Sequence, residues 1–488
     1  MFHGASHWSS TNYFYPYTST LSYNDGYFIY GIIYSIFRSI SINPLLSGEL
    51  VNVTVRIAGF FFLYGAACRL LHFNWGWALL AAVLFSISCG SYVQMFHAQL
   101  LTVCFAPGMA LLLQKTLQAL QQESKRSFFL WGSATVIAYA AWLMTAFYMA
   151  WFFALFLVLF TFAWLLLSPR HRTKALFAEL TRCKLPALLL LLLAALVDLP
   201  FFQLYLPAAA LTGMHSYASA FAYSPSVLDI INVGDRNLLF GGLNAFLRTH
   251  LRPDFPLHNE QTSGFPLIIL SLFGLAALSL CRHRDMLLRS LALTVCLTWV
   301  LFLHVRGYSL YRYVYDIVPG APAVRAIARY QLFLAAPLIL VTLAFLARHG
   351  RWLGRPVVAI VSLLLVAEQL DSDQIARINR PFELARLAKI PAPPAECAAF
   401  YISRDRGDNY ANPAIDGIYS HSVDAMLIAE IIRLPTINGF ASFLPPHYQL
   451  FYPDRPDYSD RIRLYSEQNH VAGLCSLDLR DMRWQTSL

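Results

Sequence analysis

Long runs of apolar residues recur along the chain up to about residue 370, and they limit what it can fold into. A transmembrane helix needs about 20 mostly apolar residues to cross the hydrocarbon core of a bilayer. The hydrophobic content is 57% and the mean hydropathy is +0.51, whereas a soluble protein is about 45–50% apolar. The sequence therefore predicts a polytopic α-helical membrane protein.

About ten runs have the length and composition of a span. The predicted spans are Val51–Leu71, Trp77–Val93, Ala98–Leu117, Phe128–Phe147, Ala150–Leu167, Leu185–Leu204, Gly264–Leu280, Leu287–Leu303, Tyr330–Ala347 and Pro356–Leu370. They form the predicted transmembrane domain, residues 51–370.

Basic residues indicate which side of the membrane each loop faces. One set of alternate loops carries fifteen basic residues against three acidic ones, Glu123, Glu179 and Asp285. These basic residues are Arg69, Lys115, Lys125, Arg126, Arg170, Arg172, Lys174, Arg182, Lys184, Arg282, Arg284, Arg289, Arg348, Arg351 and Arg355. Because cytoplasmic loops are enriched in lysine and arginine, this set is predicted to be cytoplasmic.

The other side then receives residues 1–50, loops 205–263 and 304–329, and the tail 371–488. The expected location is the cytoplasmic (inner) membrane, with a multi-pass chain and an extracytoplasmic, or periplasmic, C-terminal domain. The net charge of +9 follows from the loop residues, so the lipid bilayer is an expected partner and nucleic acid is not.

The N-terminal segment, residues 1–50, is polar and aromatic, and Tyr27–Ile42 has the apolar spacing of an interfacial helix. An exported N-terminus with no preceding span is unusual, and we expect an upstream transmembrane helix to be missing from this chain. The alternative is a protein whose first span inserts with its N-terminus outside.

The tail changes composition, with more Asp, Arg, Asn, Pro and Tyr, and is predicted to form a soluble α/β or mixed domain. Cys397 and Cys475 are the two cysteines in this tail. Since the tail is predicted to face an oxidising compartment, they are candidates for a disulfide. No cysteine or histidine cluster indicates a metal site.

Loop 304–329 contains four arginines and one acid, Asp316. They are Arg306, Arg312, Arg325 and Arg329, and such an exported excess opposes the orientation rule. An anionic ligand would offset it, because guanidinium groups bind phosphate oxygens bidentately. On a helix, Arg325 and Arg329 would share one face. Lipid headgroups or salt bridges to the C-terminal domain are the alternative partners.

Five further polar residues lie on exported segments or at span ends. Asp25 precedes a glycine and is a candidate general base or an ordinary turn residue. His97 and Tyr148 are at exported tips, where they support the site or act as interfacial groups. Asp198 near a span end is functional or paired. Glu260, just before a span, is expected to favour a helix N-terminus.

Five passages together resemble bacterial membrane proteins of the GT-C glycosyltransferase superfamily, in an uncharacterised branch. They are FYPYTSTLSYNDGYFIYGIIYSIFR, FHAQLLTVCFAPGMALLLQKTL, NEQTSGFPLIIL, VPGAPAVRAIAR and SVDAMLIAEIIRLPTINGFASFLPPHY. Their order, and their placement on the predicted exported side, agree with the topology derived from charge.

The resemblance implies an inverting transferase that moves a sugar from a polyprenyl-phosphate-linked donor to a glycan, lipid or protein acceptor. By position it implies Asp25 as the base and Arg325, Arg329 and Arg312 as the donor-phosphate cluster. No cofactor is indicated with certainty, and a divalent metal is compatible with the family. The family's acidic residue usually follows its first span, which this chain lacks, so the true base would otherwise lie upstream and the chain would be inactive.

Two other functions remain open at this point. A transporter or flippase of lipid-linked saccharides would show repeated halves and broken spans at matching positions, and the sequence shows neither. A non-catalytic assembly factor for envelope polysaccharides is the third possibility.

Overall fold

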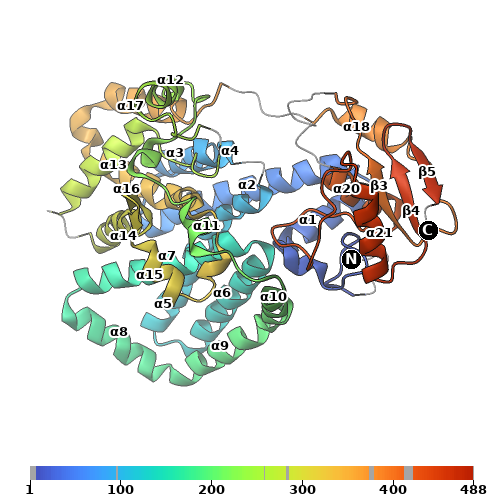
Figure 1. Cartoon of the computed structure of the whole chain (residues 1–488). Helices are drawn as coiled ribbons and strands as arrows, with labels where there is room; N and C mark the ends of the chain where they lie inside the picture. Colours follow the sequence, from blue (N-terminus) through green and yellow to red (C-terminus); the bar gives the residue numbers. More distant parts are fainter. Residues whose placement is uncertain are drawn as a thin grey trace. The chain divides into compact units, whose positions relative to one another are not determined.

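The structure is a computed structural model that describes residues 7–94, 97–257, 259–281, 285–372, 378–411 and 421–486, with Arg351 described by its backbone alone. The chain divides into two compact units. The first unit comprises Met1–Gly26, Pro200–Gly213 and Gln374–Leu488, and the second comprises Tyr27–Leu199 and Met214–Asp373. Figure 1 shows the helices of the second unit and the small sheet of the first.

In the described part of the chain, six helical segments are long and apolar enough to cross a membrane, or seven if one bent pair is a single span. The six are Pro44–Leu70, Trp75–Val93, Ala98–Gln121, Lys125–Thr145, Phe147–Leu167 and Ile327–Gly350. The bent pair is Arg170–Arg182 with Lys184–Val197, at an angle of 77°. The chain is thus a multi-pass helical membrane protein by length and composition.

These segments are built from α2 (Pro44–Leu70), α3 (Trp75–Ser86), α4 (Cys89–Val93), η2 (Ala98–Phe105), α5 (Ala106–Gln121), α6 (Lys125–Thr145), α7 (Phe147–Leu167), α8 (Arg170–Arg182), α9 (Lys184–Val197), η6 (Ile327–Arg329) and α16 (Tyr330–Leu353). Three further predicted spans overlap shorter apolar helices of the second unit: α13 (Leu267–Leu280), α14 (Met286–Phe302) and α17 (Arg355–Ala367). The predicted span Trp77–Val93 covers α3 and α4, and Ala98–Leu117 covers η2 and α5. The run Leu185–Leu204 is not one continuous helix. That run is divided at Asp198 between α9 and α10 (Leu199–Thr212).

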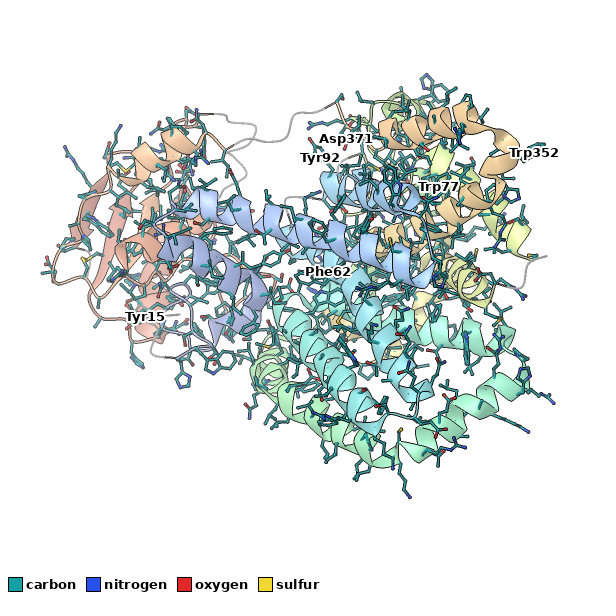
Figure 2. All side chains as sticks on the ribbon, turned by 180° about the vertical axis from the view of Figure 1, so that it is seen from behind. Tyr15, Phe62, Trp77, Tyr92, Trp352 and Asp371 are labelled. Carbon is teal, nitrogen blue, oxygen red and sulfur yellow. A yellow bond between two sulfur atoms is a disulfide. The ribbon has the colours of Figure 1, made fainter. Side chains whose placement is uncertain are left out.

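Helix α16 is the most buried of the candidate spans, with 83% of its apolar window inside the protein. It packs against α3, α7, α13, α14 and α17. Trp77 near the start of α3 lies close to Gly350 near the end of α16, where a Cβ would come within 3.8 Å of the tryptophan ring. Trp352 is exposed at the end of the same helix (Figure 2). Tryptophans at helix ends are typical of membrane interfaces.

Helix α1 (Phe28–Ser39) occupies most of the predicted interfacial segment. Its inner face is fixed by Tyr30, whose hydroxyl donates to the carbonyl of Ala98 at 2.8 Å. Its outer face is an exposed stripe at four-residue spacing, formed by Phe28, Ile32 and Ile36. This arrangement agrees with an amphipathic helix at a bilayer surface.

The remaining elements of the second unit are short and lie in the two long loops predicted to be exported. They are α11 (Tyr217–Phe221), η3 (Val227–Ile231), α12 (Gly241–Phe246), η4 (Leu247–Leu251), β1 (His304–Val305), β2 (Tyr308–Ser309), α15 (Tyr311–Ile317) and η5 (Ala321–Ala323). The long loop 205–263 therefore carries its own short helices.

The first unit contains a three-stranded sheet of order β3-β4-β5, with β3 (Ala399–Arg404) parallel to β4 (Leu474–Asp478) and β5 (Arg483–Thr486) antiparallel to β4. The helices described in its C-terminal part are α18 (Arg380–Leu387), α20 (His421–Ile432) and α21 (Tyr458–Gln468), and η1 (Thr20–Tyr23) precedes α1. Cys397 and Cys475 form a disulfide with their Cα atoms 5.7 Å apart. This is the pair that the sequence analysis singled out.

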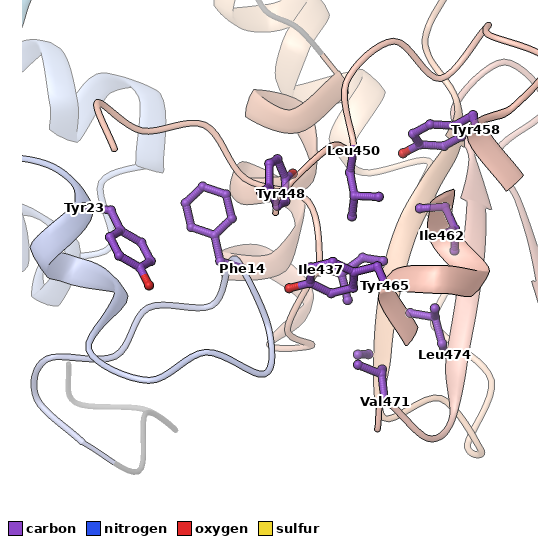
Figure 3. Close-up of a cluster of buried hydrophobic side chains, with 11 residues drawn as sticks. Phe14, Tyr23, Ile437, Tyr448, Leu450, Tyr458, Ile462, Tyr465, Val471 and Leu474 are labelled. Atoms are coloured by element: carbon purple, nitrogen blue, oxygen red, sulfur yellow. The ribbon is translucent and has the colours of Figure 1, made fainter. Parts of the chain in front are cut away.

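The N-terminal residues up to Gly26 belong to this first unit, although the sequence analysis treated 1–50 as one segment. Phe14 is fully buried, and its ring packs edge-on against Tyr23 and Tyr448 (Figure 3). The backbone N–H of Phe14 donates to the carbonyl of Asn438 at 3.3 Å. A Cβ on Gly439 would come within 2.4 Å of the Phe14 ring, so glycine is required there. The Asn-Gly dipeptide of the tail motif, Asn438-Gly439, therefore packs directly against Phe14 of the N-terminal segment.

A buried ion network joins α18, α20 and the loop after β3. Arg406 donates to both Glu383 (2.9 Å) and Asp424 (2.6 Å). Arg386 donates to the same two carboxylates at 2.8 and 2.9 Å. All four side chains are buried. Because each charge has a partner of opposite sign, the network can stay ionised away from water. Asp424 of the tail motif therefore has a structural role.

Candidate functional site

The loop before α16 carries Arg325 and Arg329 and is held by backbone contacts within the second unit. The N–H of Arg325 donates to the hydroxyl of Tyr148 at 2.7 Å. The N–H of Ala328 donates to the carbonyl of Tyr223 at 3.1 Å, and its carbonyl accepts from the Ser263 hydroxyl at 2.9 Å. The helix begins only at Ile327, so Arg325 precedes it and the two arginines do not share a helix face.

They converge instead on Glu260. Its carboxylate lies 2.5 Å from Nη2 of Arg329 and 3.8 Å from Nη2 of Arg325. Nε2 of His97 is 3.9 Å from the same carboxylate. Glu260 thus lies within 4 Å of three basic side chains. Together with Tyr148, which accepts from the N–H of Arg325, they form what we call the Glu260 cluster: His97, Tyr148, Glu260, Arg325 and Arg329.

The segment that carries Glu260 is rigidly placed. The Gln94 side-chain amide donates to the carbonyls of Asn259 and Thr262 at 2.8 and 3.1 Å. Gly264 packs directly on the backbone of another loop, where a Cβ would lie 2.5 Å from the N atom of Asn232. The glycine before the Phe-Pro entry into α13 is therefore needed for close packing, and it positions Glu260.

The members of the cluster differ in their access to water. The side chains of Arg329 and Glu260 are 7% and 15% exposed, whereas that of Arg325 is 43% exposed. A buried guanidinium is tolerable only with a counter-charge, which Glu260 supplies to Arg329. Among the described residues, Nε of Arg329 has no hydrogen-bond acceptor. Arg325 therefore offers a solvent-facing guanidinium, whereas Arg329 is buried beside Glu260.

Aromatic rings complete the surroundings. The guanidinium of Arg325 lies over the Tyr223 ring at 5.1 Å from its centroid, and that of Arg329 over the Tyr148 ring at 5.9 Å. Such cation–π contacts contribute about 0.5–2 kcal/mol each and restrict the orientation of the guanidinium planes.

His97 is held neutral in this cluster. Burial, together with the charge of Arg329, lowers the pKa of His97 to about 4, while Glu260 opposes the shift. At pH 7 the cluster therefore contains two positive guanidinium groups and one carboxylate. Its excess of positive charge makes it suited to one anionic ligand.

A small cavity of about 40 Å³ adjoins His97. Its polar lining residues are Asn52, Arg56, Ser91, Gln94 and His97. Arg56 of α2 donates to the carbonyl of Ser86 at 2.9 Å, so its charge is anchored on a helix C-terminal turn. The cavity has room for ordered water beside the cluster.

Other candidate residues lie apart from these contacts. Arg312 pairs with Asp316 at 2.7 Å and lies 4.6 Å from the centroid of the Tyr217 ring. Asp198 caps the end of α9. Asp25 follows η1 in the first unit, and its approach to the arginines of the second unit stays a prediction.

Glu260 does not have the helix-terminal role that the sequence analysis favoured. Helix α13 begins at Leu267, and the N–H groups of Ile268 and Ile269 donate to Glu368, both at 2.9 Å. Glu368 is fully buried. A lone acidic residue in an apolar run is itself a signal of a specific partner, and this signal could have identified Glu368 in the run Pro356–Leu370.

Within the described ranges, no group of three His, Cys, Asp or Glu side chains is placed to hold a metal ion. The compatibility with a divalent metal that the resemblance implies therefore rests on the resemblance alone.

Compared with known protein families and with curated proteins, the sequence gives no significant match to either.

Proposed function

We propose that the protein is a GT-C-like glycosyltransferase. It would move a sugar from a polyprenyl-phosphate donor to an envelope acceptor at the outer face of the cytoplasmic membrane. The proposal includes about ten spans and an exported first unit. The observation that supports it most is the Glu260 cluster, where two arginines of the loop predicted to be exported meet at one carboxylate, with one guanidinium open to water.

The chemistry needs a stabilised leaving group. The acceptor hydroxyl would attack the anomeric carbon of the sugar while the bond from that carbon to the phosphate oxygen breaks. The phosphate keeps the bonding electrons, and cationic donors stabilise its growing charge. Arg325 would bind phosphate oxygens through its exposed guanidinium, and the buried Arg329 would add positive charge beside it.

The acceptor proton requires a base. Asp25 is the base that the resemblance implies, and we retain it as part of the proposal. Glu260 is less suited to this task, because its carboxylate is only 15% exposed and is already engaged by Arg329 at 2.5 Å.

The test is an assay with a labelled polyprenyl-phosphate sugar in proteoliposomes. Arg325→Ala removes hydrogen bonds to a charged group, each contributing about 1.5–3 kcal/mol, so the KM for the donor should rise roughly 10- to 100-fold. Asp25→Asn should abolish turnover while donor binding is retained.

Arg252→Ala is the matched control, because Arg252 lies in the other long loop of the second unit and pairs with Asp254. It should leave the KM unchanged. Transbilayer movement of the intact donor without sugar transfer would instead identify a transporter. Absence of both transfer and movement, with the donor still bound, would favour an assembly factor.

A further inference from the structure

The hairpin that follows α14 has one face turned to the protein and one turned away. His304 and Ser309 form one cross-strand pair, and Val305 and Tyr308 form the next. The His304 ring contacts the carbonyl of Ser224 at 3.1 Å, so the first pair faces inward. Val305 and Tyr308 are exposed, the latter to 84%. The outward pair is thus apolar and aromatic.

Helix α15 continues this pattern. Its inner face consists of Tyr311 and Val314, both buried. Its outer face presents Leu310, just before the helix, with Tyr313 and Ile317, and Ile317 is 75% exposed. This short helix therefore has apolar side chains on two faces, and only the inner one packs against the protein.

The exposed apolar residues of the hairpin and of α15 all lie within the short segment 305–317. Scattered apolar residues on a surface need no explanation, but a contiguous patch marks an interaction site. Two exposed arginines, Arg306 and Arg312, lie in the same segment, and Arg312 is paired with Asp316 at 2.7 Å. We call Val305, Tyr308, Leu310, Tyr313 and Ile317 the outer patch.

The length of α14 indicates what covers this patch. With 17 residues, α14 spans about 25 Å at 1.5 Å per residue, which is less than the ~30 Å hydrocarbon core. If α14 crosses the bilayer, its end at Phe302 lies near the edge of the core. The hairpin begins two residues later, at the depth of the lipid headgroups.

We propose that β1, β2 and α15 form an interfacial anchor that inserts the outer patch into the headgroup–acyl boundary of the outer leaflet. Tyrosines are enriched at this depth, and arginines extend from it to lipid phosphates. Arg306 would contact the phosphates of anionic lipids. The anchor depends on α14 being a span, and it does not depend on glycosyl transfer.

The anchor also fixes the depth of the Glu260 cluster. Arg325 follows Ile317 after the η5 turn in the same loop. A loop held at the headgroup level keeps Arg325 where a phosphate attached to a lipid chain is found. The cluster would therefore meet lipid-linked anions in preference to soluble ones.

Depth-dependent fluorescence quenching tests the anchor in the full-length protein in bilayers. The free cysteines described in the structure are replaced by alanine, and an environment-sensitive fluorophore is attached to Tyr308→Cys or Ile317→Cys. Val300→Cys on α14 is the lipid-facing reference, and Asp254→Cys in loop 205–263 is the water-facing reference; both side chains are well exposed. Lipids with a quencher near the headgroup are compared with iodide in solution.

The anchor predicts strong quenching by the headgroup-level lipid at positions 308 and 317, and at least threefold weaker quenching by iodide than at position 254. Replacing phosphatidylglycerol by phosphatidylcholine should reduce the lipid quenching, and Arg306→Ala should have the same effect. Iodide quenching equal to that at position 254 would overturn the anchor. Protection from both quenchers would do so too, since it would place a protein surface on the patch. Equal quenching in both lipids would overturn the phosphate contact.

Discussion

Glu260 determines whether the buried charge of Arg329 is stable, because it lies 2.5 Å from that guanidinium with little access to water. The sequence analysis identified the arginines but assigned Glu260 to a helix end. Its partners are far away in the chain, and no local pattern such as helical spacing indicates that they meet. The arginine excess in loop 304–329 predicts an anionic partner. In the structure, one anionic partner of Arg325 and Arg329 is the carboxylate of Glu260.

Glu260→Gln should destabilise the protein by about 3 kcal/mol, because removing one partner of a buried ion pair leaves an uncompensated charge. The measurement is the free energy of unfolding in detergent, followed by tryptophan fluorescence. Asp254→Asn is the control, since it breaks an exposed pair with Arg252 and should cost less than about 1 kcal/mol. Equal losses for the two variants would contradict the importance of the Glu260 pair.

The pKa of His97 leads to a pH dependence with a defined sign. The pKa is lowered to about 4 in the folded protein, whereas an unfolded chain has a histidine pKa of about 6.5. Between these values the unfolded state binds a proton that the folded state does not, so stability falls as the pH is lowered from 6.5 toward 4.

The titration of His97 can be followed by NMR of isotope-labelled histidine, with His97→Gln to assign the signal. The His97→Gln variant should lose less stability than the parent over the same pH range. A midpoint near 6.5 for His97 would show that neither burial nor the arginines act on the ring.

Among the elements, the apolar runs predicted a multi-pass helical protein, since run length and hydropathy are local properties of the sequence; in the described residues six or seven segments meet the length and hydropathy of a span. The structure divides the run Leu185–Leu204 at Asp198 because that polar residue ends α9. The short helices α13, α14 and α17 were predicted as spans, and they are shorter than the hydrocarbon core requires without adjacent residues.

The disulfide between Cys397 and Cys475 closes a long loop, with a sequence separation of 78 residues. The chain-entropy model gives about 4 kcal/mol for a loop of this length, and removal of natural disulfides typically costs 2–5 kcal/mol. The double variant Cys397→Ser/Cys475→Ser should therefore destabilise the first unit by about that amount. Urea unfolding followed by hydrogen exchange in α21 would measure it.

Cys281→Ser provides the comparison, because Cys281 is an exposed free cysteine at the end of α13. It should leave the exchange of α21 unchanged. A double variant as stable as the parent would mean that the disulfide contributes nothing to the folded unit.

For the whole molecule, the distribution of basic residues predicts the orientation of the chain in the membrane. The structure shows which residues belong to each of the two compact units. Reporter fusions at Gln122, in a predicted cytoplasmic loop, and at Leu474, in β4, should report opposite sides of the membrane. The same side for both would contradict the topology and the site that depends on it. The sequence did not reveal that residues before Gly26 join the first unit, because Phe14 and Gly439 are too far apart for any periodic pattern to relate them.

The packing contact between Phe14 and Gly439 also determines when the first unit can fold. The segment around Phe14 is made first, but the glycine that receives its ring is synthesised only near the end of the chain. At about 5–20 residues per second, Phe14 waits on the order of 20–80 seconds for its partner. During this interval the membrane helices are inserted while an aromatic segment stays unpaired. Biogenesis of this protein should therefore depend on whatever protects exposed aromatic segments until translation ends.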